Sequence, residues 1–312
     1  MNKAFLLRKT LRLLMSLLLF SFLLYGLLYL STGDPALGLL RRLGVQAASQ
    51  QVIEETRAGL GINGGFWQQY IRWLFNMMQG DFGRSFMTNA PVLSAIVDKL
   101  AVTLQLMGSS FILYVAFSLG LGSMIGNFSF AQGLKPILSI VLSFPIYWLA
   151  LLAIFIFGVQ LKWFPFIGSS TSKHFMLPVI VICLSEGSYL AKMVGDLVGT
   201  VAHSERQVVA KFRGIKWYYR FYYQLKEVFV PLITLYGNSL THLFGGTILI
   251  EIIFSISGLG KLLMDAISAR DYPVIQGITL IVACATFLLN YLMDLLIEKM
   301  DSRIQIHPQR GK

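Results

Sequence analysis

The chain has 312 residues, of which 55% are hydrophobic and only 13% are charged, and its formal net charge is +11. Soluble domains carry about 25% charged residues, so this composition excludes an ordinary soluble protein and indicates a membrane protein. The positive charges gather at the ends of apolar runs rather than along one polar face, which favours orientation at a lipid surface over nucleic-acid binding.

The first apolar run, Leu13–Thr32, contains no charged residue. It is longer than the hydrophobic region of a typical secretion signal and has no small-residue cleavage site after it, so we expect a retained transmembrane helix. The tail before it carries only positive charges, at Lys3, Arg8, Lys9 and Arg12. Such a tail stays in the cytoplasm, and residues 1–32 are therefore predicted to be a cytoplasmic tail and first span.

Residues 33–99 form a long segment with nearly balanced charges, which we expect on the external side of the membrane. Two stretches in it, Ala48–Leu60 and Trp67–Met78, can form short surface helices. Several glycines between them predict a break.

Residues 100–312 are predicted to hold five further spans. Each apolar run can cover about 30 Å of hydrocarbon at about 1.5 Å per residue. The runs are Leu100–Leu134, Pro136–Leu161, Phe175–Leu190, Val228–Ile250 and Tyr272–Met293, with Glu186 interrupting the third of them. The expected fold is therefore all-α: a polytopic membrane protein with six transmembrane helices and both termini in the cytoplasm.

Residues 204–226 lie on the cytoplasmic side in this topology and carry six positive charges against Glu205 alone. Charge by itself is typical of any cytoplasmic loop. The pattern Ala210-Lys211-Phe212-Arg213-Gly214, with Pro231 at the start of the next span, resembles the EAA loop of ABC importer permeases. In that family the loop forms two short helices with a Gly between them and docks in a groove of the ATPase subunit. The resemblance implies ATPase coupling for Ala210, Lys211, Arg213 and Gly214.

Most of the remaining chain resembles the dipeptide, oligopeptide and nickel branch of these permeases. The matching stretches include Gly80-Asp81-Phe82-Gly83 with Ser85, Gly258-Leu259-Gly260, and Arg270-Asp271-Tyr272-Pro273-Val274. The resemblance implies the type I (MetI-like) permease fold in a bacterial cytoplasmic (inner) membrane. It also implies a second homologous permease subunit, two ATP-binding subunits and an extracytoplasmic solute-binding protein. The residues it implies for external docking or gating are Asp34, Asp81, Glu251, Arg270 and Asp271, and the connection Ser255–Asp271 should share that face.

The cargo is predicted from the stretch Thr32-Gly33-Asp34-Pro35-Ala36-Leu37, which is most similar to the nickel-type permeases. We therefore expect nickel or another divalent transition metal as cargo, free or as a chelate with a small metallophore. A dipeptide or oligopeptide importer is the alternative. No residue pattern assigns a metal ligand in the chain itself.

Nucleotide chemistry is not expected in this chain. Gly260-Lys261 is followed by Leu262, and Ser255 stands where a P-loop needs its first glycine, so the P-loop pattern is missing. We expect the chain to be non-catalytic, to bind no cofactor, and to leave ATP to its partner subunits.

Two polar residues within the predicted spans are candidates for the translocation pathway. Glu186 is either a cavity wall that attracts a cation or a hydrogen-bonded packing residue, because an isolated carboxylate is costly at membrane depth. His242 either adds an imidazole to the same cavity or is structural. A remote alternative, an intramembrane hydrolase, would use Ser239 with His242, although Ser239 also suits a small packing position.

Overall fold

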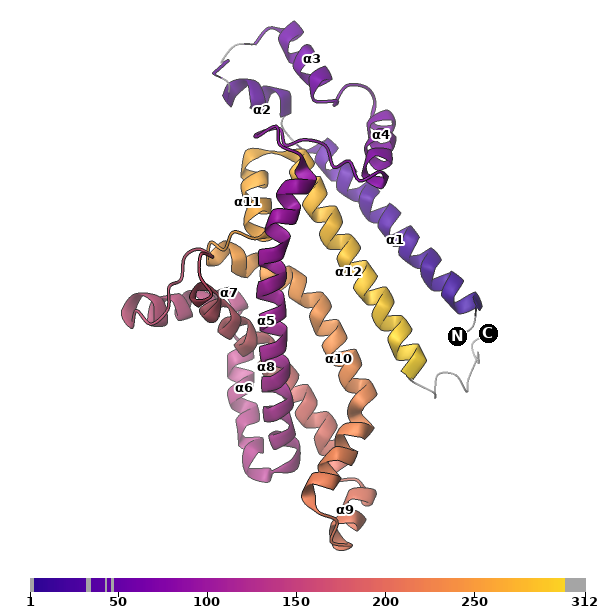
Figure 1. Ribbon diagram of the computed structural model, residues 1–312, viewed down its shortest axis with the longest axis vertical. Coiled ribbons are helices and arrows are strands. Elements are labelled where there is room, and N and C mark those ends of the chain that lie inside the picture. The colour runs from indigo at the N-terminus through magenta and orange to yellow at the C-terminus, as the bar shows by residue number, and fades with distance from the viewer. Residues whose placement is uncertain (1–2, 32–34, 43, 46–47, 301–312) are drawn as a thin grey trace. The chain divides into compact units, whose positions relative to one another are not determined.

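The computed structural model describes residues 3–31, 35–42, 44, 45 and 48–300, and all regular elements in these ranges are helices (Figure 1). The long ones are α1 (Lys3–Leu30), α5 (Val92–Asn127), α8 (Lys173–Ala202), α10 (Trp217–Ile253) and α12 (Tyr272–Met300). The shorter ones are α2 (Pro35–Arg42), α3 (Gln50–Gly59), α4 (Phe66–Met78), η1 (Ser129–Gly133), α6 (Leu134–Leu142), α7 (Ile146–Ala153), η2 (Ile154–Gln160), α9 (Glu205–Phe212) and α11 (Leu259–Ala269).

The chain divides into two compact units. Among the described residues, unit 1 consists of 104–256 and 289–300, and unit 2 consists of those up to 103 together with 257–288. Helices α5 and α12 each contribute one part to both units.

In unit 1, α5 and α8 approach each other through glycines. A Cβ atom on Gly122 would lie 2.6 Å from Val194 Cβ, and one on Gly126 would lie 2.7 Å from Gly199 N. On the α8 side, a Cβ on Gly195 would lie 2.8 Å from Ile125 Cγ2. Small residues four apart on both helices allow this backbone contact, as is common in membranes. Because the contacts advance in the same direction along both helices, α5 and α8 are parallel.

Helix α10 runs in the opposite direction to α8 and α12. Its start packs on the end of α8, where Val194, Val198, Val228 and Leu232 form a buried cluster. Thr241 Oγ1 donates a hydrogen bond to Asn290 Oδ1 of α12 at 3.1 Å, and Gly237 lies against Met293. The two pairs advance in opposite directions along α10 and α12, which makes these helices antiparallel.

The predicted span Pro136–Leu161 is not one continuous helix, because this stretch contains a sharp bend. Ser129–Leu142 and Ile146–Gln160 meet at an angle of 92°, with Pro145 at the start of the second half. Proline has no N–H to donate and disfavours helical conformation in the residue before it, which explains the break. Helix α6 is antiparallel to α8: Lys135 pairs with Asp196 at 2.6 Å, and Lys192 Nζ donates to Ser139 Oγ at 2.8 Å.

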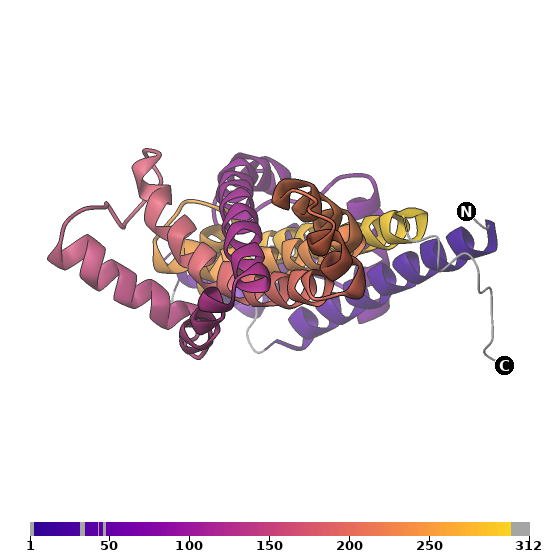
Figure 2. The same ribbon diagram turned by 90° about the horizontal axis from the view of Figure 1, so that it is seen from below.

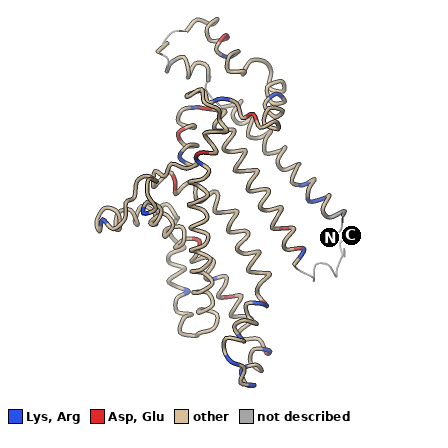
Figure 3. Tube along the Cα trace, viewed as in Figure 1, with Lys and Arg blue, Asp and Glu red and all other residues tan. Residues whose placement is uncertain are grey.

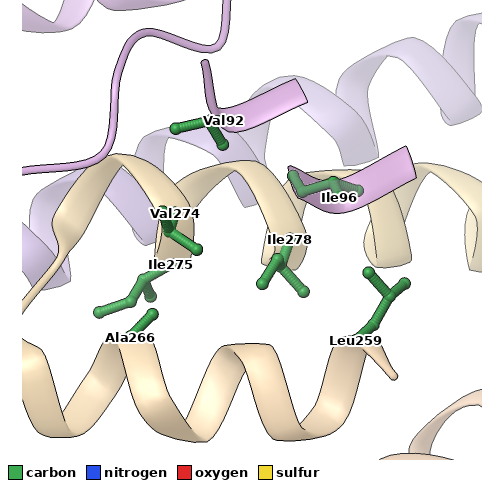
Figure 4. Close-up of a cluster of buried hydrophobic side chains, with 7 residues drawn as sticks. All are labelled: Val92, Ile96, Leu259, Ala266, Val274, Ile275 and Ile278. Carbon is green, nitrogen blue, oxygen red and sulfur yellow. The ribbon is translucent and has the colours of Figure 1, made fainter. Parts of the chain in front are cut away.

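The core of unit 2 lies where α5, α11 and α12 meet (Figure 4). Figure 4 shows side chains of the three helices pointing toward one another. The buried residues are Val92, Ile96, Leu259, Ala266, Val274, Ile275 and Ile278. Gly277 makes room for this contact, since a Cβ there would lie 2.9 Å from Val92 Cγ1.

The external segment is tied to α1 by aromatic rings. Phe22 of α1 packs edge-on against Phe66 and Tyr70 of α4. Tyr25 Oη donates to Gln69 Oε1 at 3.1 Å, and Ser21 Oγ lies 3.0 Å from Tyr70 Oη. The predicted helices Ala48–Leu60 and Trp67–Met78 correspond closely to α3 and α4.

Within the described residues, four helices are long and apolar enough to cross a membrane, or five if the bent pair counts as one span. The four are Leu6–Leu30, Val92–Asn127, Lys173–Ala202 and Tyr272–Met300. The expected count of six is not confirmed by length and composition, because α10 is not among these spans. The connection Ser255–Asp271, which was expected to be a loop, contains helix α11.

We predict that Gly126→Val destabilises the transporter by about 1–3 kcal/mol, because the new side chain meets the backbone of α8. Gly120→Val is the matched control: it is on the same helix, has the same β-branched cost, and its Cβ has no neighbour within 4 Å. Thermal unfolding of the transporter in detergent measures both variants. Equal losses in the two would contradict the proposed role of close α5–α8 packing.

Candidate functional site

The basic segment between α8 and α10 forms a helical hairpin with a glycine turn. Helix α9 ends at Phe212, and Gly214 follows with a φ of +73°. Gly214 N donates to Lys211 O at 3.0 Å, and Ile215 N donates to Ala210 O at 3.1 Å. This bond pair is the Schellman ending of a helix, in which a left-handed residue, most often glycine, satisfies the last carbonyls.

The hairpin exposes aromatic and basic side chains together. Phe212 and Trp217 are 86% and 70% exposed, and Tyr222 follows at 61%. Lys and Arg residues gather at this end of unit 1 (Figure 3). Figure 1 and Figure 2 show α9 folded back beside the first turns of α10, where Gln207 Nε2 reaches Arg220 O at 3.5 Å. Water covers such rings poorly, so this surface suits a protein partner.

The predicted coupling residues all lie on this hairpin. Ala210 and Lys211 are in the last turn of α9, and Arg213 and Gly214 form its cap. The expectation of two separate short helices is wrong in one respect. The second helix is not separate, because it continues without interruption through Pro231 as α10.

In unit 2, Asp271 fastens the loop before α5 to the corner between α11 and α12. Its carboxylate, 3% exposed, accepts hydrogen bonds from Ser85 Oγ and, at 3.0 Å, from Phe86 N. Ser85 Oγ in turn accepts from Met87 N and Thr88 N at 3.1 and 3.0 Å. A carboxylate with several donors makes strong, charge-assisted bonds, so this contact holds the two segments together.

Two more side chains join the start of α5 to the segment after α10. Lys99 Nζ donates to Ser257 Oγ at 2.7 Å, and Leu259 N donates to Thr103 Oγ1 at 2.9 Å. The hydroxyl of Thr103 thus serves the first turn of α11, whose backbone N–H groups lack partners within the helix. Arg270, exposed and left-handed with a φ of 54°, ends α11.

Unit 2 also contains an open cavity of about 1020 Å³. Aromatic rings and charges of both signs line it, among them Tyr25, Glu54, Arg72, Trp73, Asp81 and Tyr272. Asp81 itself is exposed, and its Oδ1 accepts from Gly83 N at 2.9 Å. The predicted docking residues Asp81, Arg270 and Asp271 therefore all belong to unit 2.

The remaining two external candidates are placed differently. Glu251 lies in unit 1 near the end of α10 and is completely buried. A buried side chain does not form part of the surface of this chain, so Glu251 does not itself offer a docking contact. Its role in gating stays a prediction. Asp34 lies outside the described residues.

The two pathway candidates, Glu186 and His242, come together in unit 1. Glu186 of α8 is half-buried, and His242 of α10 is exposed. Tyr114 of α5 contacts both helices: its hydroxyl accepts from Ser239 Oγ of α10 at 3.1 Å, and its Cβ would lie 3.4 Å from a Cβ on Gly187, the residue after Glu186. Ser118 Oγ and Tyr236 Oη form a second polar contact between α5 and α10 at 2.9 Å.

The geometry gives less support to the hydrolase alternative and to a metal site within this chain. The Ser239 hydroxyl bonds to Tyr114 rather than to His242, so the serine is not paired with a base as a hydrolase requires. Within the described residues, no three His, Cys, Asp or Glu side chains gather as they would around a metal ion.

Sequence reasoning missed Tyr114 and Thr103. Tyr114 is one aromatic residue in a long apolar run, and nothing local distinguishes it from lipid-facing residues. Ser85 follows only from the family resemblance. Its hydrogen-bond partner Asp271 lies 186 residues later in the sequence, so no local pattern could predict the contact.

The comparisons with known proteins agree with this geometry. Residues 113–306 match the family described as the binding-protein-dependent transport system inner membrane component, and residues 2–107 match the N-terminal part of such components. The chain therefore belongs to this family, the permease subunits of ABC importers. Such a permease works with ATPase subunits and a solute-binding protein, and it resides in the inner membrane.

Individual relatives cover nearly the whole chain. A Brucella melitensis protein, whose name assigns it to peptide transport as a permease, is 30% identical over 98% of this chain and 99% of its own length. The glutathione transport system permease of Escherichia coli strain K12 is 28% identical over 96% of this chain and 98% of its own. The inward-facing MetNI methionine ABC transporter has a similar fold, with a TM-score of 0.57 and 14% identity over 66% of this chain and 96% of that one.

We predict that Asp271→Asn speeds amide hydrogen exchange at Phe86, Met87 and Thr88 about tenfold or more, because one charge-assisted acceptor is lost. Hydrogen–deuterium exchange of the detergent-purified transporter measures this rate. Asp265→Asn, at an exposed position of α11, is the control and should leave the loop unchanged. Unaltered exchange in the Asp271 variant would show that other contacts hold the loop.

Proposed function

We propose that this chain is the permease subunit of an ABC importer for short peptides. Coupling of this permease to its ATPase subunits is supported by the α9–α10 hairpin. The hairpin has a left-handed glycine at its turn and an exposed aromatic and basic surface. A rigid hairpin of this kind transmits the movement of an ATPase, because contact energy at its tip biases two states of the bundle.

Peptides are preferred over nickel because of the relatives' names. The reported relatives that match the whole chain are named for peptide or glutathione transport. None of them supports the nickel-type prediction made from residues 32–37, half of which lie outside the described residues. Metal import remains the second candidate on the strength of that sequence stretch alone.

We infer six crossings, with α10 as the fifth. Helices α5 and α8 are parallel, so the bent segment between them has to return the chain to the other side of the membrane. Helix α10 is antiparallel to both α8 and α12 and carries the uncharged run Val228–Ile250, which supports a further crossing. Under the positive-inside rule, this topology places the α9–α10 hairpin and both termini in the cytoplasm.

The working transporter is proposed to contain a second homologous permease, two ATP-binding subunits and an external solute-binding protein. ATP binding by the partners closes them, moves the hairpins and opens the pathway outward, and the binding protein then releases its cargo. The external segment 33–99 with the corner at Arg270 and Asp271 would receive the binding protein. The cavity lined by Asp81 offers it mixed charges and aromatic rings.

The pathway itself is proposed to pass the Glu186 and His242 side chains. A carboxylate and an imidazole that reach the surface at membrane depth are costly against lipid, so this face is expected to be wet. The chain is proposed to be non-catalytic and to bind no nucleotide.

We predict that Gly214→Pro abolishes transport while the protein remains in the membrane. Proline fixes φ near about −65° and lacks the N–H that bonds Lys211 O, so the turn cannot form. Gly214→Asn is the control, since asparagine tolerates the left-handed region and should retain most transport. Peptide uptake and the amount of membrane-bound protein are measured together. Normal uptake by the proline variant would refute the coupling role.

We predict that deleting this chain lowers uptake of radiolabelled dialanine and leaves uptake of radioactive nickel unchanged. The comparison uses cells that lack other peptide importers, with and without the gene supplied on a plasmid. Loss of nickel uptake that excess dialanine does not affect would instead establish metal import.

A further inference from the structure

The surroundings of Glu186 are set by a close contact between α5 and α8. A Cβ on the next residue, Gly187, would lie 2.9 Å from Phe117 Cδ1 and 3.4 Å from Tyr114 Cβ. Glycine at this position therefore lets Tyr114 and Phe117 of α5 pack on α8 one residue after Glu186. Tyr114 also contacts α10, because its hydroxyl accepts from Ser239 Oγ at 3.1 Å, and His242 follows Ser239 by about one helical turn. Residues of three helices therefore meet near Glu186.

In the part of the chain that the structure describes, no Lys or Arg forms a salt bridge with this carboxylate. The runs 100–134, 174–185, 187–191 and 228–250 contain no Lys, Arg, Asp or Glu. The next cation along α8, Lys192, donates its hydrogen bond to Ser139 of α6 instead. Within the described residues, Glu186 has no ion pair.

Glu186 is nevertheless accessible. The side chain is half-buried, and its oxygens are not among the buried polar atoms of the described chain that lack a partner. A carboxylate that is reachable, lacks a counter-charge and lies within the apolar helices attracts a cation from the pathway.

The donor set favours an ammonium group over a metal ion. Transition metals in proteins take about four or more ligands, whereas within the described residues no three His, Cys, Asp or Glu side chains gather here as they would around a metal ion. An ammonium group needs only acceptors for its N–H bonds, which a carboxylate and a neutral imidazole nitrogen can supply. The amino terminus of a peptide carries such a group.

We propose that Glu186, beside His242 and Tyr114, is the subsite of the translocation pathway that receives the terminal ammonium group of a peptide. The assignment rests on the proposed peptide import and adds to it a residue that distinguishes peptides with a free amino terminus. As cargo crosses this level, the carboxylate replaces the water lost from the ammonium group and so lowers the barrier for such peptides.

The test uses the complete importer, with both permeases and the ATPases, trapped with a non-hydrolysable ATP analogue and without its binding protein. Equilibrium binding of radiolabelled dialanine and of N-acetyl-dialanine is measured for wild type, Glu186→Gln, Glu186→Asp and Glu227→Gln. We expect Glu186→Gln to weaken dialanine binding about tenfold or more, and Glu186→Asp to restore part of it. N-acetyl-dialanine should bind Glu186→Gln at least as well as wild type. Glu227→Gln, an exposed carboxylate on α10, should behave as wild type.

Three results would overturn the assignment. Wild type could show no preference for the free amino terminus, or Glu186→Gln could weaken both ligands equally, as a purely structural residue would. Loss of the second permease from the purified Glu186→Gln complex would instead indicate an ion pair between subunits. Uptake of dialanine by wild-type cells is measured in parallel, so absence of uptake would count against peptide import itself rather than against the subsite.

Discussion

The close approach of α5 and α8 is the constraint on which the organisation of unit 1 depends. Only glycine at Gly122, Gly126 and Gly195 leaves room for the two backbones. Two parallel helices in such contact require the chain between them to return, which explains why the bent segment exists. The same seam continues to Gly187, where Tyr114 packs on α8 one residue after Glu186. The close glycine contact between α5 and α8 therefore determines both the helix packing of unit 1 and the residues that lie near Glu186.

The segments of unit 2 are held together by buried hydrogen bonds as well as by apolar packing. Asp271 fastens the loop at Ser85, and Thr103 serves the first turn of α11. The Asp271 bond links the predicted docking segment to the residue just before α12, and the Thr103 bond links α5 to α11. A binding protein that pulls on the loop would therefore act on a transmembrane helix directly, without an intervening flexible joint.

Much of the fold could be predicted from the sequence because apolar runs and glycine breaks are local signals. The short helices α3 and α4 and four of the long spans follow from them. Pro145 is a local signal for the bend. The apolar composition of Pro136–Leu161 nevertheless predicted one uninterrupted span there. Helix α11 was missed although Leu259, Leu262, Leu263 and Ala266 have helical spacing, because glycine and serine precede them. Glu186 and His242 could be nominated as polar residues in spans. Their proximity to each other and to Tyr114 depends on helix packing, which no local pattern contains.

The bend between α6 and α7 also has a consequence for biogenesis. The fourteen residues of Ser129–Leu142 and the fifteen of Ile146–Gln160 each reach only about 21–23 Å, so neither half spans about 30 Å of hydrocarbon. Backbone groups at the corner need protein cover at that depth, and α8, which contacts both halves, is translated after them. The ribosome therefore releases this segment when α5 is present to pack on it but α8 is not. Under the proposed topology, the third crossing would be completed only after α8 is made, late in membrane insertion.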